Sequence, residues 1–251
     1  MAETSPSDRL RVAIVDDEEP ARTVLREYLA AYPEIEVVAE CANGFEAVRA
    51  ADELDPGLLL LDVQMPGLSG FEVLELLDRD VAVVFVTAYD EHALRAFEVH
   101  AVDYLLKPFS AERLGQALAR ARQRLGRPQP GLAGIAAAAR PAGATLTRLL
   151  VREGPQVHVI PVEALDVAEA RDDCVCLRSR GREYRKQPTL AELEAQLDPE
   201  KFVRVHRSFI VNVERVARIE RYAKDSRLVV LRDGSKLPVS RPGYARLRGR
   251  L

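Results

Sequence analysis

Apolar, β-branched runs alternate with amphipathic stretches along the first half of the chain. Each run has the length of a strand, and each amphipathic stretch repeats its apolar residues at helical spacing. The alternation predicts an α/β doubly wound parallel sheet of five strands, covered by helices on both faces. The predicted strands are 10–15, 36–40, 58–61, 81–86 and 101–106, and the predicted helices are 19–32, 44–54, 70–79, 91–100 and 111–125.

The second half has a different pattern, in which short apolar runs are separated by turn residues such as the Asp-Gly pair at 233–234. It predicts a mostly-β domain with one clear helix at 189–197, where Thr189 and Glu192 fit a capping box. No pair of helices joined by a short turn is predicted, so a helix-turn-helix is not supported. The predicted strands are 149–154, 157–161, 164–170, 174–179, 182–186, 202–205, 213–220, 227–232 and 235–240.

A segment rich in Gly, Pro and Ala separates the two patterns. Residues 126–144 are interpreted as a linker between a domain at 9–125 and a domain at 145–251. The formal charge changes sign between the halves. Residues 1–125 hold 12 basic and 24 acidic side chains, a net −12, whereas the rest of the chain holds 24 basic and 15 acidic ones, a net +9. This asymmetry suggests two tasks, the second with an anionic partner.

Membrane and disulfide features are missing from the sequence pattern. No apolar run approaches the roughly 20 residues that a membrane span needs, and the polar first ten residues do not resemble a signal peptide. We therefore expect a cytoplasmic protein without a membrane partner. Cys41, Cys174 and Cys176 imply no disulfide framework. Cys174 and Cys176 could share one face of a strand, but no matching Cys or His pair lies nearby, so small buried side chains are favoured over metal ligands.

Charged and hydroxyl side chains follow four of the five strands predicted in the first domain. Asp16 and Asp17 follow the first strand, Asp62 the third, Thr87 the fourth and Lys107 the fifth. The carboxyl ends of parallel strands meet at one edge of a sheet, where ligands bind. Three clustered carboxylates repel one another unless a hard cation such as Mg²⁺ neutralises them. The metal and Lys107 could then stabilise a phosphoryl group transferred to one carboxylate, with Thr87 donating to a phosphoryl oxygen.

Two other interpretations of these aspartates are weaker. A single Asp after a strand is more often a helix cap or a turn residue, but four strand ends agree here. A phosphatase of the haloacid-dehalogenase type would carry its nucleophile in an Asp-x-Asp pattern after the first strand. Asp16 and Asp17 are adjacent, so the sequence lacks that spacing.

The motifs VAIVDDE, LLLDVQMPGLSG, VFVTAYDEHALRAF and VDYLLKPF occur in this order within residues 9–125. With them, this half of the chain resembles the receiver domain of two-component response regulators. The resemblance implies that Asp62 accepts a phosphoryl group from a sensor histidine kinase. It implies that Mg²⁺ is surrounded by Asp16, Asp17, Asp62 and the backbone carbonyl of Gln64.

The same resemblance implies how the phosphoryl group is sensed. Thr87 and Tyr104 form the switch pair, and Lys107 contacts the phosphate. Phosphorylation changes the face made by the fourth helix, the fifth strand and the last helix, and this face then favours a homodimer. The resemblance also implies a cis Lys107–Pro108 bond and a loop after Asp62 that is shaped by Gly67 and Gly70.

The segments KFVRVHRSFIVNVERVARIE and VVLRDGSKLPVSRPGYARLR lie within residues 145–251. With them, the second half resembles the LytTR-type DNA-binding domain of the LytR, AlgR and AgrA regulators. The resemblance implies an elongated set of small β-sheets. It also implies that loops, rather than a recognition helix, enter successive major grooves of bent, double-stranded DNA with direct-repeat half-sites.

Three places should face DNA by this resemblance. They are the loop EARDDCV with Arg171, the segment VHRSF, and the segment VSRPGY with Arg241. In VHRSF, Arg207 can reach a base edge, whereas His206 and Ser208 hold phosphate or the loop. Arginine suits bidentate readout of guanine, and lysine suits phosphate; the candidate lysines are Lys224 and Lys236.

Two residues in these segments allow a second interpretation. The adjacent Asp172 and Asp173 would repel phosphate, so the Arg171 contact departs from the simple pattern. Asn212 could contact a base, but holding the loop through backbone hydrogen bonds is favoured.

The combined interpretation is a response regulator transcription factor rather than an enzyme, with only phosphoacceptor and self-dephosphorylation chemistry at Asp62. The alternative is a phospho-responsive adaptor whose basic domain docks an acidic protein. A DNA footprint distinguishes the two, because protected sites that repeat near one helical turn favour the transcription factor. An enzyme controlled by a receiver is disfavoured, since His158 and His206 have no nucleophile or metal partner at recognisable spacing.

Overall fold

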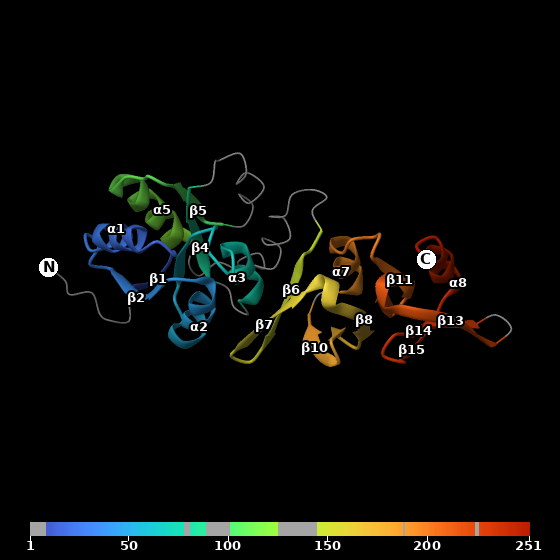
Figure 1. Ribbon diagram of the computed structural model, residues 1–251. Coiled ribbons are helices and arrows are strands. Elements are labelled where there is room, and N and C mark those ends of the chain that lie inside the picture. Colours follow the sequence, from blue (N-terminus) through green and yellow to red (C-terminus); the bar gives the residue numbers. More distant parts are fainter. Residues whose placement is uncertain (1–8, 78–80, 89–100, 125–144, 188, 224–225) are drawn as a thin grey trace. The chain divides into compact units, whose positions relative to one another are not determined.

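The computed structural model describes residues 9–77, 81–88, 101–124, 145–187, 189–223 and 226–251 (Figure 1). The chain divides into two compact units between residues 141 and 142. The linker predicted at 126–144 lies outside the described residues. No helix in the described part is long and apolar enough to cross a membrane.

The N-terminal unit is built on a five-stranded parallel sheet with the order β2-β1-β3-β4-β5. β2 lies on one side of β1 and β3 lies on the other, so the strand order reverses at β1, as in other doubly wound sheets. The predicted fold class is confirmed. The strands are β1 (Leu10–Val15), β2 (Ile35–Cys41), β3 (Leu58–Leu61), β4 (Ala82–Thr87) and β5 (Asp103–Leu106).

Four described helices accompany this sheet: α1 (Glu19–Leu29), α2 (Gly44–Leu54), α3 (Gly70–Leu76) and α5 (Ala111–Arg124). The helix predicted at 91–100 lies outside the described residues. α1 ends three residues earlier than predicted, because Pro33 disfavours helical geometry in the residue before it. A capping box between Ser69 and Glu72 fixes the start of α3.

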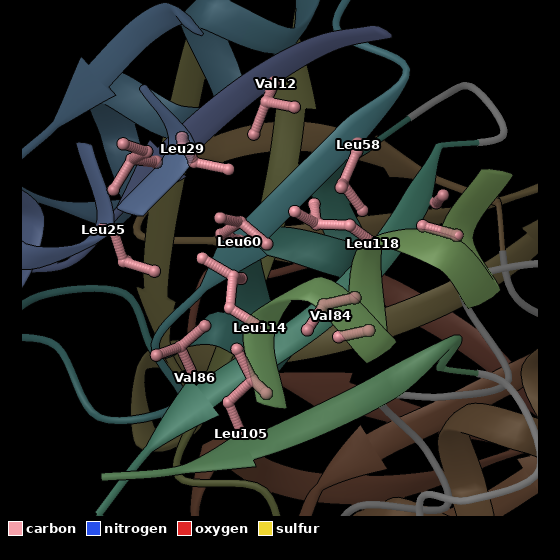
Figure 2. Close-up of a cluster of buried hydrophobic side chains, with 14 of the residues drawn as sticks. Val12, Leu25, Leu29, Leu58, Leu60, Val84, Val86, Leu105, Leu114 and Leu118 are labelled. Carbon is pink, nitrogen blue, oxygen red and sulfur yellow. The ribbon is translucent and has the colours of Figure 1, made fainter. Parts of the chain in front are cut away.

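Helices cover both faces of the sheet, as the apolar strands predicted. On one face, side chains of all five strands pack against α1 and α5, with Ile35 and Val37 of β2 only partly buried. Figure 2 shows Val12, Leu58, Leu60, Val84, Val86 and Leu105 meeting Leu25, Leu29, Leu114 and Leu118. On the other face, Phe71 of α3 lies against Phe85 of β4, with ring centroids 5.1 Å apart. Burial of each such side chain contributes about 1.5–3 kcal/mol, so the carboxyl edge of the sheet is rigidly supported.

The C-terminal unit contains three small antiparallel sheets, with strand orders β10-β9-β8-β12-β11, β13-β14-β15 and β6-β7. It is mostly β, as predicted. The strands are β6 (Arg148–Glu153), β7 (Gln156–Pro161), β8 (Leu165–Arg171), β9 (Cys174–Ser179), β10 (Arg182–Lys186), β11 (Phe202–His206), β12 (Phe209–Asn212), β13 (Val216–Ala223), β14 (Ser226–Leu231) and β15 (Lys236–Val239). The helices are α7 (Leu190–Gln196) and α8 (Arg241–Arg248), and single 3₁₀ turns are formed by Val162–Ala164 and Val213–Arg215.

Local sequence signals in this unit were mostly interpreted correctly. Thr189 and Glu192 form the predicted capping box at the start of α7. The Asp-Gly turn joins β14 to β15, with Gly234 at a φ of 86°. The strand predicted at 213–220 begins later, because the Asn212 side chain accepts a hydrogen bond from the Glu214 amide and starts a 3₁₀ turn.

The terminal helix α8 was not predicted, although its first residues carry helix signals. Ser240 caps it by accepting a hydrogen bond from the Gly243 amide, and Pro242 lies in its first turn. Gly243 argues against a helix in the sequence pattern, because glycine is a poor helix former. A Cβ atom at Gly243 would lie 2.0 Å from the carbonyl oxygen of Val205. Glycine is therefore needed there for α8 to pack against β11.

Gly243→Ala should lower the free energy of unfolding by about 1–3 kcal/mol, because α8 must move away from β11 to admit the methyl group. Gly249→Ala is the matched control, since a Cβ there would meet no atom closer than 3.6 Å. Thermal unfolding by calorimetry measures both variants. Equal stability of the two would contradict this account of the helix.

Candidate functional site

Three carboxylates meet at the carboxyl edge of the parallel sheet. Asp16 and Asp17 follow β1 and Asp62 follows β3, and one oxygen from each lies within 4.8 Å of the others. Asp16 and Asp62 are buried, whereas Asp17 is exposed. Negative charges at this separation repel one another strongly when they are partly shielded from water. The cluster therefore depends on positive charge held close to it.

Lys107 supplies part of that charge. Its Nζ lies 2.7 Å from Asp16 Oδ2 and 2.8 Å from Asp62 Oδ2. Its backbone amide donates to the carbonyl of Thr87, and the Lys107–Pro108 peptide is cis, as predicted. Burial acts to lower the pKa of Lys107, but the hydrogen bonds and charges of the two carboxylates outweigh burial and raise the pKa. The ammonium therefore stays charged.

The buried carboxylate of Asp16 lies beside Lys107 and two further carboxylates. Burial raises the pKa of Asp16, against the contact with Lys107 and the hydrogen bond from the Glu18 amide. Oδ2 of Asp16 lies 2.7 Å from Lys107 Nζ, so its negative charge is partly balanced by that ammonium. One ammonium beside three carboxylates leaves the cluster with net negative charge, and such a group of oxygens fits the all-oxygen coordination of Mg²⁺. Asp16, Asp17 and Asp62 could hold such an ion.

The loop after Asp62 wraps closely around that residue. The Gln64 amide donates to Asp62 Oδ1 at 3.1 Å and fixes the orientation of the carboxylate. A Cβ at Gly70 would lie 2.3 Å from the backbone oxygen of Asp62, and Gly67 has a φ of 82°. Both glycines are needed for this path of the chain, in agreement with the sequence-based expectation.

Thr87 and Tyr104 lie on the neighbouring strands β4 and β5. Thr87 ends β4 and is buried, while Tyr104 on β5 is half-buried and pairs with Phe85. Arg113 of α5 donates to the Tyr104 carbonyl at 2.6 Å, and its guanidinium lies 6.0 Å from the centre of the tyrosine ring. These contacts link Tyr104 to α5.

An ion-pair network around the buried Asp103 was not predicted from the sequence. Arg113 donates to both carboxylate oxygens of Asp103 at 2.7 and 2.8 Å, and Arg120 donates to one of them at 2.9 Å. Burial acts to raise the pKa of Asp103, but these hydrogen bonds and positive charges lower it overall. The seven-residue spacing of the two arginines, two helical turns apart on one face of α5, was the available signal.

A second candidate site lies at one end of the five-stranded sheet of the C-terminal unit. Arg171 ends β8, and Arg207 and Ser208 form the turn between β11 and β12. The Ala170 amide donates to the Ser208 carbonyl at 2.9 Å, which places the two turns side by side. Arg207 is exposed at the tip of its hairpin.

Contacts of its neighbours hold this hairpin in shape. Arg204 bridges the turn by donating to the Arg207 carbonyl at 2.9 Å, while it also pairs with Glu194. Nδ1 of His206 accepts from the Ser208 amide at 3.3 Å. His206 and Ser208 thus stabilise the turn that presents Arg207.

The start of α8 joins the same end of the sheet. The amide and the hydroxyl of Ser240 both donate to the Val205 carbonyl, at 2.9 and 3.0 Å. Arg241 follows directly as the first residue of α8 and is exposed. The three segments that the sequence singled out, although far apart along the chain, are therefore gathered in one place.

The remaining residues predicted to contact DNA differ in whether acidic side chains of the protein already pair with them. Arg171 is engaged by Glu169 at 2.6 Å and Glu183 at 3.3 Å, and these hydrogen bonds raise its pKa. Lys236 begins β15 at the far end from Ser240 and pairs with Glu220 at 2.9 Å. Lys224 lies outside the described residues.

Asn212 has the structural role that the sequence favoured. It is buried, its Nδ2 donates to the Leu165 carbonyl at 3.0 Å, and its Oδ1 accepts from the Glu214 amide at 2.9 Å. Both polar ends of the side chain are thus used inside the protein, so Asn212 is not available to read a base.

Comparison with known proteins agrees with this division into two sites. Residues 12–119 match the response regulator receiver domain family, and residues 155–251 match the LytTr DNA-binding domain family. An uncharacterised response regulatory protein of Yersinia pestis is 36% identical over 96% of this chain and 98% of its own. The transcriptional regulatory protein BtsR of Escherichia coli is 35% identical, over 92% of this chain and 95% of its own. The sensory transduction protein LytT of Bacillus subtilis is 34% identical, over 92% and 95%.

Mg²⁺ should raise the thermal unfolding temperature of the protein, because a ligand that binds only the folded chain stabilises it by mass action. Asp16→Asn should remove most of this rise, since a neutral amide replaces a buried carboxylate of the cluster. Glu36→Gln, which removes one exposed charge on β2, should respond to Mg²⁺ as the wild type does. An Mg²⁺ response that survives Asp16→Asn would contradict the proposed metal site.

Asp103→Asn should lower the free energy of unfolding at neutral pH by about 1–3 kcal/mol. The cost is smaller than that of breaking a fully buried pair, because the side chains of Arg113 and Arg120 are 31% and 59% exposed. The folded protein lowers the pKa of Asp103, so its stabilisation is complete above the unfolded pKa of about 3.9 and is lost in stronger acid. Urea unfolding across this pH range should therefore show the two proteins converging as pH falls. A constant difference would contradict the ion-pair account.

Proposed function

The chain belongs to the response regulators that join a receiver domain to a LytTR DNA-binding domain, and we propose that phosphorylation of Asp62 controls its action on DNA. Membership makes it a transcriptional response regulator, whose partners are DNA and a sensor kinase. The observation that carries the proposal is the contact of Lys107 with both Asp62 and Asp16 at the carboxyl edge of the sheet.

In the proposed phosphoryl transfer, a carboxylate oxygen of Asp62 attacks the phosphorus of a phosphohistidine on the kinase. The new O–P bond forms as the P–N bond breaks, and the imidazole leaves. Lys107, 2.8 Å from Asp62 Oδ2, is close enough to pair with a phosphoryl oxygen, and the hydroxyl of Thr87 would donate to another. Hydrolysis of the acyl phosphate by water then returns Asp62 to its starting state.

Mg²⁺ is the cofactor that suits this transfer. Receiver domains generally use it at an acidic pocket, and Asp16, Asp17, Asp62 and the backbone carbonyl of Gln64 would hold it here. When bound, it supplies positive charge to the phosphoryl group during transfer. Lys107 alone is a single positive charge beside three carboxylates, so a divalent cation improves the charge balance of the site.

The signal would pass from Asp62 to the far side of the domain through Thr87 and Tyr104. A phosphoryl group that draws Thr87 toward it leaves space that the Tyr104 ring can fill. Arg113 contacts both the carbonyl and the ring of Tyr104, so a movement of Tyr104 would be felt by α5. A face that includes β5 and α5 would then favour a homodimer, and two DNA-binding domains would engage direct-repeat half-sites together.

DNA would be read by the three gathered segments of the C-terminal unit. Arg207, exposed at its hairpin tip, is the best placed to reach a base edge, and Arg241 lies beside it on α8. His206 and Ser208 hold the turn or a phosphate, and Lys224 and Lys236 suit phosphates. Arg171 would have to exchange Glu169 and Glu183 for DNA, which makes its contribution smaller.

Asp62→Asn should abolish covalent labelling of the protein by a radioactive phosphodonor, since an amide oxygen is a poor nucleophile. Asp55→Asn, at an exposed position after α2, should be labelled as the wild type is. Labelling is measured after gel electrophoresis under mild conditions that preserve acyl phosphates. Undiminished labelling of Asp62→Asn would show that another residue accepts the phosphoryl group.

Arg207→Ala should weaken binding to a DNA duplex selected by the wild-type protein by roughly 5- to 150-fold, the cost of one bidentate base contact of about 1–3 kcal/mol. Binding to an unrelated duplex should change much less. Arg180→Asn removes the same charge from the turn at the opposite end of the sheet, where asparagine tolerates the φ of 50°, and should bind normally.

The same binding assay tests the assignment of the hairpin. Full affinity in Arg207→Ala would mean that another face of the domain reads DNA. If the wild-type protein selects no preferred sequence and leaves no footprint, the basic domain docks an acidic protein instead.

A further inference from the structure

Arg227 lies beside the first turn of α8 and has no role in the contacts described so far. It stands on β14 opposite Val239 of β15, the residue that precedes the helix cap Ser240. Its guanidinium carbon lies 4.0 Å from the centre of the Tyr244 ring, on α8. Figure 1 shows β14 and α8 in the same part of the C-terminal unit. Arg227 is therefore held beside the first turn of α8, the helix that begins at Arg241.

Arg227 differs in its partners from several other arginines of this unit. Arg171, Arg204 and Arg218 each pair with a glutamate. Within the described residues, no carboxylate forms an ion pair with Arg227. Stacking on an aromatic ring uses only the face of a guanidinium, so its five N–H donors remain in the plane for another acceptor. The guanidinium of Arg227 is thus held in place by the ring, and no carboxylate of the described residues accepts from its N–H groups.

A second arginine stands directly across the sheet from it. Arg221 of β13 pairs in register with Arg227, and side chains at paired positions share one face of a sheet. Arg221 is exposed and, among the described residues, also lacks a carboxylate partner. Like charges directly opposite one another destabilise a sheet. An anion bound between them would remove this cost.

We propose that Arg227, held on Tyr244 and facing Arg221, binds a backbone phosphate of the DNA duplex. This inference rests on the proposed DNA-binding function and adds a phosphate contact beside Arg241. The fork of guanidinium donors matches the oxygens of a phosphate. Arg227 is half-buried and lies over the Tyr244 ring, which favours a phosphate at the surface over a base deep in a groove. Its contact fixes how the first turn of α8 lies on the duplex.

Tyr244 acts in this proposal as a positioning residue. Its ring is half-buried and packs against the apolar cluster formed by β11, β12, β14, β15 and α8. The helix that carries it is anchored through Ser240 and Gly243 on the Val205 carbonyl. A guanidinium stacked on so fixed a ring loses little further freedom when it binds, which favours affinity.

The test measures dissociation constants for the selected duplex and for an unrelated duplex over a series of salt concentrations. Arg227→Gln should weaken both complexes by a similar factor, roughly 5- to 20-fold, because phosphate contacts carry no sequence information. The slope of log affinity against log salt should become shallower by about 1. Arg218→Gln, which lies three residues from Arg221 and so on the opposite face of β13, is the charge-matched control and should behave as wild type.

Three conservative variants separate binding from folding. Tyr244→Phe keeps the ring and should bind as wild type, whereas Tyr244→Leu should lose affinity while the salt slope stays near its wild-type value. Arg227→Lys keeps the charge and the slope but should bind more weakly than wild type, since lysine lacks the planar fork. Each variant is first checked for a wild-type unfolding temperature. If Arg227→Gln fails this check, Arg221→Gln replaces it and should reproduce the loss of slope.

The outcomes are distinguishable. Unchanged affinity and slope in Arg227→Gln would overturn the phosphate contact, and a loss confined to the selected duplex would make Arg227 a base reader instead. If the wild-type protein binds neither duplex, the DNA-binding function itself fails. If Arg207→Ala loses affinity while Arg227→Gln does not, only this inference fails.

Discussion

The ammonium of Lys107, held between Asp16 and Asp62, is the interaction on which the signalling half of the molecule depends. Without this ammonium, the two buried carboxylates would repel each other strongly. The hydrogen bond from the Lys107 amide to the Thr87 carbonyl joins the ends of β4 and β5 and holds Lys107 within reach of both carboxylates. The apolar strands and their helices make the edge rigid enough to keep these distances short. A phosphoryl group on Asp62 would compete for the same ammonium, so the contact that stabilises the resting site is also the one that phosphorylation would change.

Whereas the signalling half has clustered negative charge, the DNA-binding half has an excess of positive charge. Its excess of arginine is partly neutralised inside the unit, as in the pairs of Arg171 with Glu169 and Arg204 with Glu194. Other basic side chains, Arg207 and Arg227 among them, stand where the described residues offer no such neutralisation. The antiparallel sheet and the cap of α8 collect them at one end through backbone hydrogen bonds, so the arrangement depends on the main chain rather than on any single side chain. Acidic side chains thus pair with only some of the arginines. The arginines without such a partner among the described residues suit an anionic ligand.

Sequence patterns predicted most of the fold because they report local physics. The runs 10–15 and 58–61 became strands with these same bounds, since unbroken apolar segments between turns have few other structures available. α8 was missed because a glycine usually indicates a break in a helix. Gly243 is instead required by the close approach of the Val205 carbonyl, 38 residues earlier in the chain. The pairing of Asp103 with Arg120 and the stacking of Arg227 on Tyr244 join residues 17 apart in each case. Such contacts depend on tertiary structure: the spacing of Arg113 and Arg120 places both on one face of α5, but it does not identify Asp103 as their partner. The acidic cluster was predictable because all parallel strands end at one edge.

The central claim is that the charge at Asp62 sets the affinity for DNA. The most direct measurement is the dissociation constant of the wild-type protein for its selected duplex, at constant Mg²⁺ and salt, with and without a small-molecule phosphodonor. The account predicts a tighter complex with the donor, and by linkage a phosphorylated form that DNA favours over the unphosphorylated one. An identical dissociation constant in both conditions, with Asp62 shown to be fully phosphorylated in one of them, would contradict it.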